Sequence, residues 1–237
     1  MHMAQGLWTV MKGMFIKMRN NNTPKLLIIT GGNIDEVFLR KLVDINQYSE
    51  IIAADHGLVA GDYLNLPLDF IVGDFDSVPK DIIDKYGRNN VPIFTFPTEK
   101  DKTDTELAIE LAIQQGAKSI DIVGATGSRL DHTLANMHLL TIPLKKGVEA
   151  YIIDANNKFY LKKDSFAIQK NNQYGDYISF LPFHGDVKGL SLKGFKFPLD
   201  NVILSAGESI CISNELVDDT GEVCFTEGTL MVFESKD

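Results

Sequence analysis

Four aspartates in two short motifs are the residues of this sequence best suited to chemistry. Asp74 and Asp76 lie in the motif of residues 73–77, and Asp101 and Asp104 bound a second motif. Carboxylates that lie close together repel one another unless protons or a cation neutralise them. Mg²⁺ is commonly held by one or two carboxylates together with substrate phosphates. The two motifs therefore make phosphate chemistry with a hard divalent cation the first hypothesis.

Each motif also has a simpler interpretation. Asp76 or Ser77 is suited to cap the helix that follows, which would leave Asp74 in a turn. Asp101 and Asp104 are suited to the start of a helix, where acidic side chains interact favourably with the helix dipole. Capping alone does not explain why two acidic pairs should lie at the same edge of one predicted sheet. The metal site is therefore our first hypothesis.

The segments around the motifs alternate between strand and helix patterns, which predicts an α/β domain over residues 25–154 with a mostly parallel sheet and helices on both faces. Short apolar runs predict strands, whereas apolar residues at helical spacing predict helices. The expected strands are residues 26–30, 51–54, 70–72, 91–96, 119–123 and 148–153, and the expected helices are 34–45, one with Pro79 in its first turn, 103–115 and 130–140.

The strand patterns also say where the aspartates should lie. On an extended chain Asp74 and Asp76 would point the same way, with Phe75 turned into the core. They follow a predicted strand, and open α/β sheets bind ligands at the carboxyl ends of their strands. Thr103 and Glu106 form a capping-box pattern, which predicts that a helix begins directly beside Asp104.

A second kind of candidate site is the glycine-rich segment of residues 124–131, between a predicted strand and a predicted helix. Glycines let backbone N–H groups approach phosphate oxygens, and a guanidinium such as that of Arg129 can grip a phosphate. The segment lacks the Gly-Lys-Ser/Thr ending of a Walker A loop. Residues 31–33 form a similar, weaker loop, and none of the five histidines has metal-ligand spacing.

After about residue 155 the pattern changes to short β-rich runs separated by turn residues. Residues 155–237 are therefore expected to form an antiparallel all-β sandwich or barrel domain without a helix of convincing length. The expected strands are residues 158–161, 176–181, 202–204, 209–213, 222–225 and 229–233.

Composition narrows the class of protein. The chain has 237 residues and a formal net charge of -9, which argues against nucleic-acid or membrane-surface partners that require a basic patch. Cys211 and Cys224 have no metal-binding spacing and are expected to be reduced thiols in a strand-rich core, which fits a cytoplasmic protein. Residues 1–24, which include Trp8, are expected to be an extension or the remnant of a cloning tag.

Five motifs taken in order resemble those of one family. Residues 55–57, 73–77, 101–104, 124–131 and 212–215 together resemble thiamine pyrophosphokinase (thiamine diphosphokinase) of the bacterial type. The resemblance spans about residue 25 to the C-terminus. It implies an α/β domain, a C-terminal β-sandwich that binds thiamine, and a homodimer with its active sites between subunits. The implied reaction is the conversion of ATP and thiamine to thiamine diphosphate and AMP.

The resemblance also implies roles for individual residues. Catalysis and Mg²⁺ binding would fall to Asp74, Asp76, Asp101 and Asp104. The residues implied in ATP binding are Asp55, Gly73, Thr103, Gly127, Arg129 and Asp131. Ser213 and Asn214 would bind thiamine. Asp76 and Asp104 are both suited to accept the proton of the thiamine hydroxyl, and the sequence does not distinguish between them.

Two other functions compete with this one. A nucleotide-sugar transferase also uses an Asp-x-Asp metal site, but it leaves Asp101, Asp104 and the segment around Ser213 unexplained. A non-catalytic nucleotide or thiamine sensor would bind its ligand without releasing AMP, and it has no need of a metal site with several carboxylates. The pyrophosphokinase remains the first hypothesis.

Overall fold

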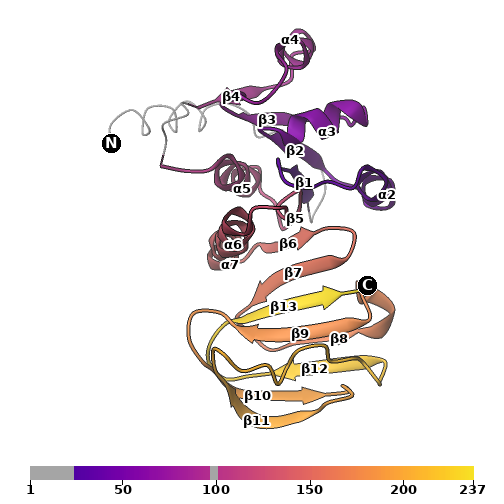
Figure 1. The fold of residues 1–237 in the computed structure, drawn as a ribbon, viewed down its shortest axis with the longest axis vertical. Coiled ribbons are helices and arrows are strands. Elements are labelled where there is room, and N and C mark those ends of the chain that lie inside the picture. Colours follow the sequence, from indigo (N-terminus) through magenta and orange to yellow (C-terminus); the bar gives the residue numbers. More distant parts are fainter. Residues whose placement is uncertain (1–23, 97–100) are drawn as a thin grey trace.

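The computed structural model describes residues 24–96 and 101–237 and divides into an α/β half and a β half (Figure 1). The elements of the α/β half are, in chain order, β1 (Lys25–Ile29), α2 (Glu36–Ile45), β2 (Glu50–Ala54), α3 (Gly57–Tyr63), β3 (Phe70–Gly73), α4 (Lys80–Arg88), β4 (Ile93–Thr95), α5 (Asp104–Gln114), β5 (Ser119–Val123), α6 (Leu130–Leu139), α7 (Thr141–Lys146) and β6 (Glu149–Ile153).

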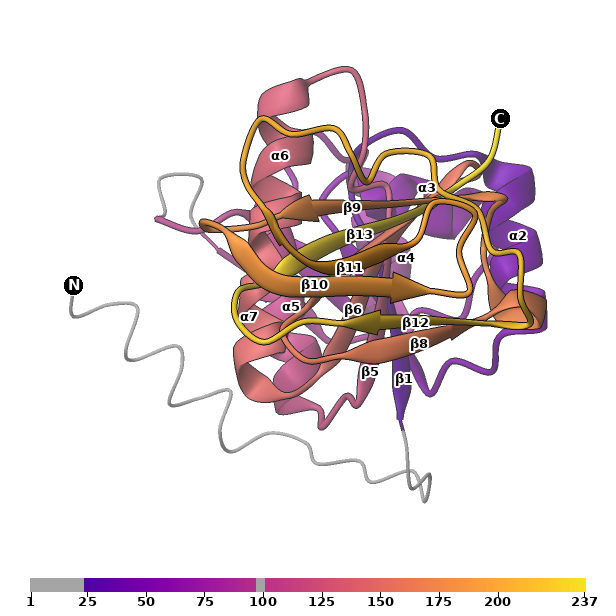
Figure 2. The same cartoon turned by 90° about the horizontal axis from the view of Figure 1, so that it is seen from below.

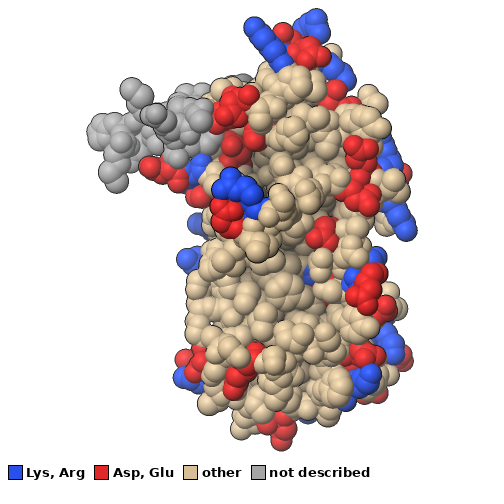
Figure 3. Space-filling view, in the orientation of Figure 1, with Lys and Arg blue, Asp and Glu red and all other residues tan. Residues whose placement is uncertain are grey.

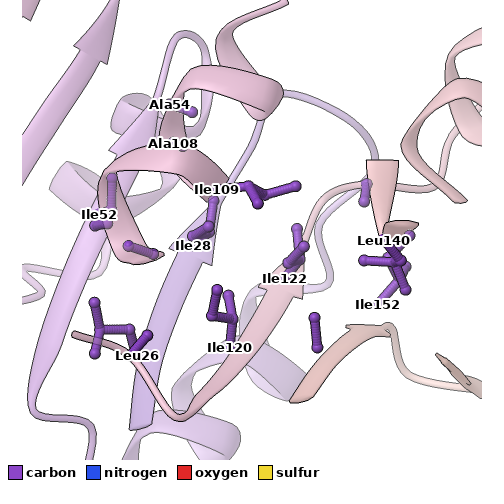
Figure 4. Close-up of a cluster of buried hydrophobic side chains, with 14 of the residues drawn as sticks. Leu26, Ile28, Ile52, Ala54, Ala108, Ile109, Ile120, Ile122, Leu140 and Ile152 are labelled. Carbon is purple, nitrogen blue, oxygen red and sulfur yellow. The ribbon is translucent and has the colours of Figure 1, made fainter. Parts of the chain in front are cut away.

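Six of these strands pair in parallel in the order β4-β3-β2-β1-β5-β6. Alternate residues of β1 serve opposite faces of this sheet. Leu26 and Ile28 pack with α5 (Figure 4). Leu27 and Ile29 pack with α2 and α3, which cover the other face of the sheet (Figure 1). A parallel sheet covered on both faces needs apolar residues at consecutive positions, which explains the short continuous apolar runs in the sequence.

The β half comprises β7 (Asn157–Lys162), β8 (Phe166–Gln169), β9 (Tyr177–Pro182), β10 (Val187–Lys193), β11 (Leu199–Leu204), β12 (Thr220–Cys224) and β13 (Leu230–Ser235). Strand β7 pairs antiparallel with β6, and β13 and β9 follow it, so one sheet of nine strands runs through both halves. The predicted fold class is confirmed, and the two halves share a sheet.

A second sheet, of order β11-β10-β12-β8, closes the β half as a sandwich. It lies over β9 and β13 (Figure 2). Phe180 and Val232 of the long sheet pack with Leu190 and Val223 of the short one in a common buried cluster. The β half therefore has a core of its own, while its backbone hydrogen bonding continues that of the α/β half.

Several predictions about elements need correction. Residues 209–213 were expected to be a strand but form a turn, in which Ser213 has a φ of 55°. Helices α3 and α7 and strands β8 and β10 lay outside the predicted segments. Pro79 is the N-cap of α4 and does not lie in its first turn.

The two cysteines are both free but differ in environment. Cys211 is buried, and burial raises the pKa of its thiol to about 11. Cys224 is exposed on β12, so the expectation that both thiols lie in the core is wrong for this residue. The alternating pattern of β12 places Val223 inside and Cys224 outside. The predicted extension of residues 1–24, including Trp8, lies outside the described residues except for Pro24.

The surface of the described residues carries charges of both signs. Acidic and basic side chains are interspersed over the face seen in Figure 3, without a continuous basic patch among its described residues. Among the described residues, the helices are too short or too polar to span a bilayer.

Candidate active site

The loops that follow β1 and β5 meet at the carboxyl edge of the parallel sheet. The strand order reverses between these two neighbours, and such a position is where α/β sheets bind ligands. Gly32 N donates to the Gly124 carbonyl over 2.7 Å, and Asn33 N donates to that of Thr126 over 2.8 Å. A Cβ atom on Gly32 would lie 2.2 Å from the Gly124 oxygen, so this approach requires glycine.

The loops that follow β2 and β3 also contact each other. Asp55 N donates to the Val72 carbonyl over 2.8 Å, and a Cβ atom on Gly73 would lie 3.2 Å from Asp55 N. Asp55 and Phe75 adopt left-handed φ angles of 47° and 61°. The Phe75 ring is buried against the core under α2 and α3, which leaves the flanking aspartates outside that core.

These turns bring three carboxylates together. One oxygen from each of Asp55, Asp74 and Asp76 lies within 4.8 Å of the other two. Ser77 Oγ donates to Asp55 Oδ1 over 3.3 Å, and Asp76 N donates to Asp74 Oδ1 over 3.3 Å. The donor set is made only of oxygens and carries up to three negative charges, which fits a hard divalent cation.

The segment of Asp74 and Asp76 differs from the prediction in two respects. The capping alternative is wrong for Asp76 and Ser77, because the N-cap of α4 is Pro79 and no side chain caps that helix. The segment is also not extended, since Phe75 is left-handed. The carboxylates of Asp74 and Asp76 nevertheless lie close together, in one group with that of Asp55. Asp55, predicted only to bind nucleotide, was missed as its third member, and its position directly after β2 was the available indication.

The second acidic motif lies at the start of α5. Thr103 is the N-cap, and its Oγ1 accepts from Glu106 N over 3.2 Å. The first turn of α5 is tied to the end of β1 by a 2.7 Å hydrogen bond between Thr30 Oγ1 and Thr105 Oγ1. Over residues 24–96 and 101–237, the carboxylate group described above includes neither Asp101 nor Asp104. The metal role of these two residues stays a prediction.

Arg129 and Asp131 form an exposed pair at the start of α6. Arg129 Nη2 donates to Asp131 Oδ2 over 2.6 Å, and Nε donates to Oδ1 over 3.2 Å. The hydrogen bonds raise the pKa of the Arg129 guanidinium and lower the pKa of the Asp131 carboxyl. Both groups are therefore charged at neutral pH, and the guanidinium retains N–H groups beyond these two bonds.

In the β half, Ser213 and Asn214 have different environments. The side chain of Asn214 is buried, and its Oδ1 and Nδ2 bond the N–H and carbonyl of Phe197 over 3.0 and 2.8 Å. Asn214 Oδ1 also accepts from Glu215 N. The amide thus holds the loop together, whereas Ser213 is exposed beside it. The predicted thiamine contact of these residues stays a prediction.

Comparison with known proteins identifies the family to which the chain belongs. Residues 42–152 match the family model described as "Thiamin pyrophosphokinase, catalytic domain", and residues 165–230 match "Thiamin pyrophosphokinase, vitamin B1 binding domain". The chain is 36% identical over 166 residues to a thiamine pyrophosphokinase of Bacillus subtilis, covering 70% of this chain and 77% of that protein. The chain belongs to the thiamine pyrophosphokinase family.

Solved thiamine pyrophosphokinase structures share the fold over most of the chain. A Bacillus subtilis enzyme superposes with a TM-score of 0.80 at 30% identity, covering 90% of this chain and 99% of that one. A Geobacillus thermodenitrificans enzyme gives a TM-score of 0.77 at 30% identity, covering 90% and 98%. The boundary between the two matched family domains falls in the region where the long sheet changes from parallel to antiparallel pairing.

Proposed function

We propose that this protein transfers the pyrophosphoryl group of ATP to the hydroxyethyl group of thiamine, giving thiamine diphosphate and AMP. Membership of the thiamine pyrophosphokinase family supports this reaction. The observation that carries the proposal is the group of Asp55, Asp74 and Asp76 at the sheet edge, because several carboxylates suit a cation–polyphosphate complex.

We assign Mg²⁺ as the metal and Asp55, Asp74 and Asp76 as its first ligands. Asp101 and Asp104 complete the acidic site from the start of α5, as the resemblance implies. A divalent cation bound there would neutralise charge on the phosphate oxygens during transfer.

The remaining residues of the carboxyl edge are assigned to ATP. Gly73 and Gly127 have no side chain to keep a phosphate away, so the backbone N–H groups of their loops are assigned to the phosphate oxygens. Arg129 supplies positive charge to the polyphosphate, and Asp131 fixes the orientation of that guanidinium. Thr103 orients the helix that carries Asp104.

The reaction joins the thiamine hydroxyl oxygen to the β-phosphorus of ATP and breaks the bond between that phosphorus and the α,β-bridging oxygen. The bridging oxygen leaves on AMP. The hydroxyl proton is accepted by a carboxylate of the site, for which Asp76 and Asp104 are the candidates. In transfers of this kind, positioning and charge neutralisation contribute more than covalent participation by the enzyme.

We further propose that the protein is a cytoplasmic homodimer. The loop of Ser213, held by the buried Asn214, would present thiamine to the α/β half of the partner subunit. Exposed apolar side chains on α6 and along the β half support an interface, because a surface of this kind is often covered by another chain.

A product assay tests the proposed reaction. The protein is incubated with ATP, thiamine and Mg²⁺, and nucleotides and thiamine esters are separated by chromatography. We expect AMP and thiamine diphosphate in equal amounts, and loss of both when EDTA is added. ADP with thiamine monophosphate would indicate a different kinase. Thiamine binding without AMP release would indicate the sensor, and either result would refute the proposal.

A further inference from the structure

Thr126 lies in the loop after β5 and is held at two of its atoms by different parts of the molecule. Its carbonyl accepts from Asn33 N, in the loop after β1, over 2.8 Å. Its hydroxyl donates to Asp154 Oδ2, at the end of β6, over 3.0 Å. The neighbouring Ala125 carbonyl accepts from Asn136 Nδ2 of α6 over 2.8 Å. The loop is thus fixed from three sides.

Asp154 belongs to the turn that joins the two halves of the molecule. Its Oδ1 accepts from Asn156 N and Asn157 N over 2.9 and 2.8 Å, which forms the tight turn between β6 and β7. The Tyr174 hydroxyl donates to the Asp154 carbonyl. One carboxylate oxygen therefore holds the turn that begins the β half, while the other holds the loop of the α/β half.

The turn is further tied to the end of the chain. Lys236 N donates to the Asn156 carbonyl over 2.9 Å. Asn156 Nδ2 donates to the Lys236 carbonyl over 3.2 Å, and Ser235 Oγ donates to Asn157 Oδ1 over 3.0 Å. These bonds fix the turn of Asp154 to the β half, so the carboxylate that accepts from Thr126 is held by the β half.

From this geometry we propose that Thr126 and Asp154 are positioning residues, which set the place of the 124–127 loop relative to the β half. The inference rests on the proposed function, in which this loop approaches the ATP phosphates and the β half binds thiamine. In the proposed homodimer each chain presents thiamine to its partner, so this hydroxyl–carboxylate bond sets where a chain holds its ATP loop relative to the β half that it presents. Because both subunits repeat this geometry, the bond aligns the two substrates at each site. A misplacement of about 1 Å can cost roughly 100-fold in rate.

Substitution of Thr126 tests the role of its hydroxyl. Thr126→Val keeps the shape of the side chain and removes the donor, so we expect kcat/KM for AMP release to fall by about 10- to 100-fold. Thr126→Ser restores the donor and should recover activity to within about threefold of the wild type. Thermal unfolding of each variant is measured alongside, and Thr126→Ala replaces the valine variant if the latter does not fold.

Substitution of Asp154 tests whether the two residues act through each other. Asp154→Ser keeps one oxygen to accept from the turn and removes the oxygen that holds Thr126. We expect a loss of kcat/KM similar to that of Thr126→Val. In the double variant the loss should be no more than about twofold greater than in either single variant, because the same bond is removed only once.

The matched control is Thr220→Val. Thr220 Oγ1 donates to Gln169 Oε1 over 2.9 Å between β12 and β8, in the sheet that does not join the α/β half. It should leave kcat/KM within about twofold of the wild type. Unchanged activity in Thr126→Val, an equal loss in the control, failure of serine to rescue, or multiplying losses in the double variant would each overturn the inference. An inactive wild type would instead refute the proposed function.

Discussion

At the scale of single residues, the site depends on backbone conformations that are unusual for non-glycine residues. Asp55 and Phe75 both have positive φ, and the burial of the Phe75 ring stabilises the second of these turns. Aspartate tolerates the left-handed region better than most side chains, because its short polar group bonds locally. Carboxylates of Asp74 and Asp76 therefore reach the same point as Asp55 from separate strand ends.

Asp74→Asn tests the carboxylate group directly. We expect the rate of AMP release to fall by roughly 100- to 1000-fold, as when a charge-stabilising group is removed from a transition state. The fold should persist, because the substitution relieves repulsion among like charges and leaves no buried charge unpaired. The assay is AMP release under saturating ATP, thiamine and Mg²⁺, together with thermal unfolding.

Asp186→Asn, in the exposed turn between β9 and β10, is the control for that variant. It makes the same change of charge in the β half, outside the group of Asp55, Asp74 and Asp76, and should retain the wild-type rate. Full activity in Asp74→Asn would remove the basis for the metal assignment.

Residue types and spacing predicted much of this site but not its geometry. The acidic motifs and their position after strands were evident from the sequence. The joining of Asp55 to Asp74 and Asp76 depends on the positive φ of Phe75, which strand periodicity does not reveal. Likewise, the use of the Asn214 amide inside its own loop depends on the tertiary approach of Phe197.

At the scale of elements, helix α5 connects local sequence to the site. Its N-cap, Thr103, was predicted from the capping pattern, and its first turn is attached to β1 through Thr30 and Thr105. The helix start thus holds Asp104 at the edge where β1 and β5 end. Helix α2 has a comparable cap, in which Asp35 Oδ1 accepts from Phe38 N over 2.9 Å.

These two caps give a paired prediction. Thr103→Ala and Asp35→Ala should each destabilise the protein by about 1 kcal/mol, because each leaves a helix N–H without its side-chain acceptor. For a chain of this size that corresponds to a fall in Tm of roughly 2–4 °C. Only Thr103→Ala should also reduce kcat/KM, since α5 carries Asp104. Calorimetry and the AMP assay measure the two effects, and equal activity in both variants would contradict the role of α5.

Elements were predictable where the pattern was long or both faces were buried. The sequence predicted β1, β2 and β5 from their continuous apolar runs and α5 from its helical periodicity. Residues 209–213 have strand-like composition, yet hydrogen bonds such as Ile212 N to the Ser209 carbonyl fold them into a turn. Strand β10 contains Gly189 and a shift of register in its pairing with β11, which obscures its alternation.

At the scale of the whole molecule, the shared sheet should make unfolding cooperative. Tyr151 of β6 lies opposite Tyr160 of β7, so the ladder crosses the boundary between the halves. We expect a single equilibrium transition in urea. The described α-helices all lie between residues 36 and 146, so the far-UV circular dichroism signal reports the unfolding of the α/β half. Hydrogen exchange of peptides from β9 and β12, measured over the same urea concentrations, reports the unfolding of the β half. Different urea midpoints for the two signals would contradict the prediction.

The proposed homodimer can also be tested at the scale of the whole molecule. Leu130 and Leu134 on α6 are 79% and 56% exposed, and Ile210 in the β half is 58% exposed. Leu130 and Leu134 are neighbours one turn apart on α6, and adjacent exposed apolar side chains commonly mark an interface. We expect sedimentation at twice the chain mass of 26.4 kDa. Leu134→Asp or Ile210→Asp should weaken the dimer by roughly tenfold or more, since a desolvated carboxylate is unfavourable at an apolar contact.

Val37→Asp provides the comparison for these interface variants. Val37 is 80% exposed on α2, which covers the face of the sheet opposite to α5 and α7, so its charge should leave the dimer intact. If active sites form between subunits, specific activity will fall on dilution in Leu134→Asp and will be constant over the same range in Val37→Asp. A monomeric wild type with full activity would show instead that one chain holds the whole site, and the Ser213 loop would then have to reach the carboxylates of its own α/β half.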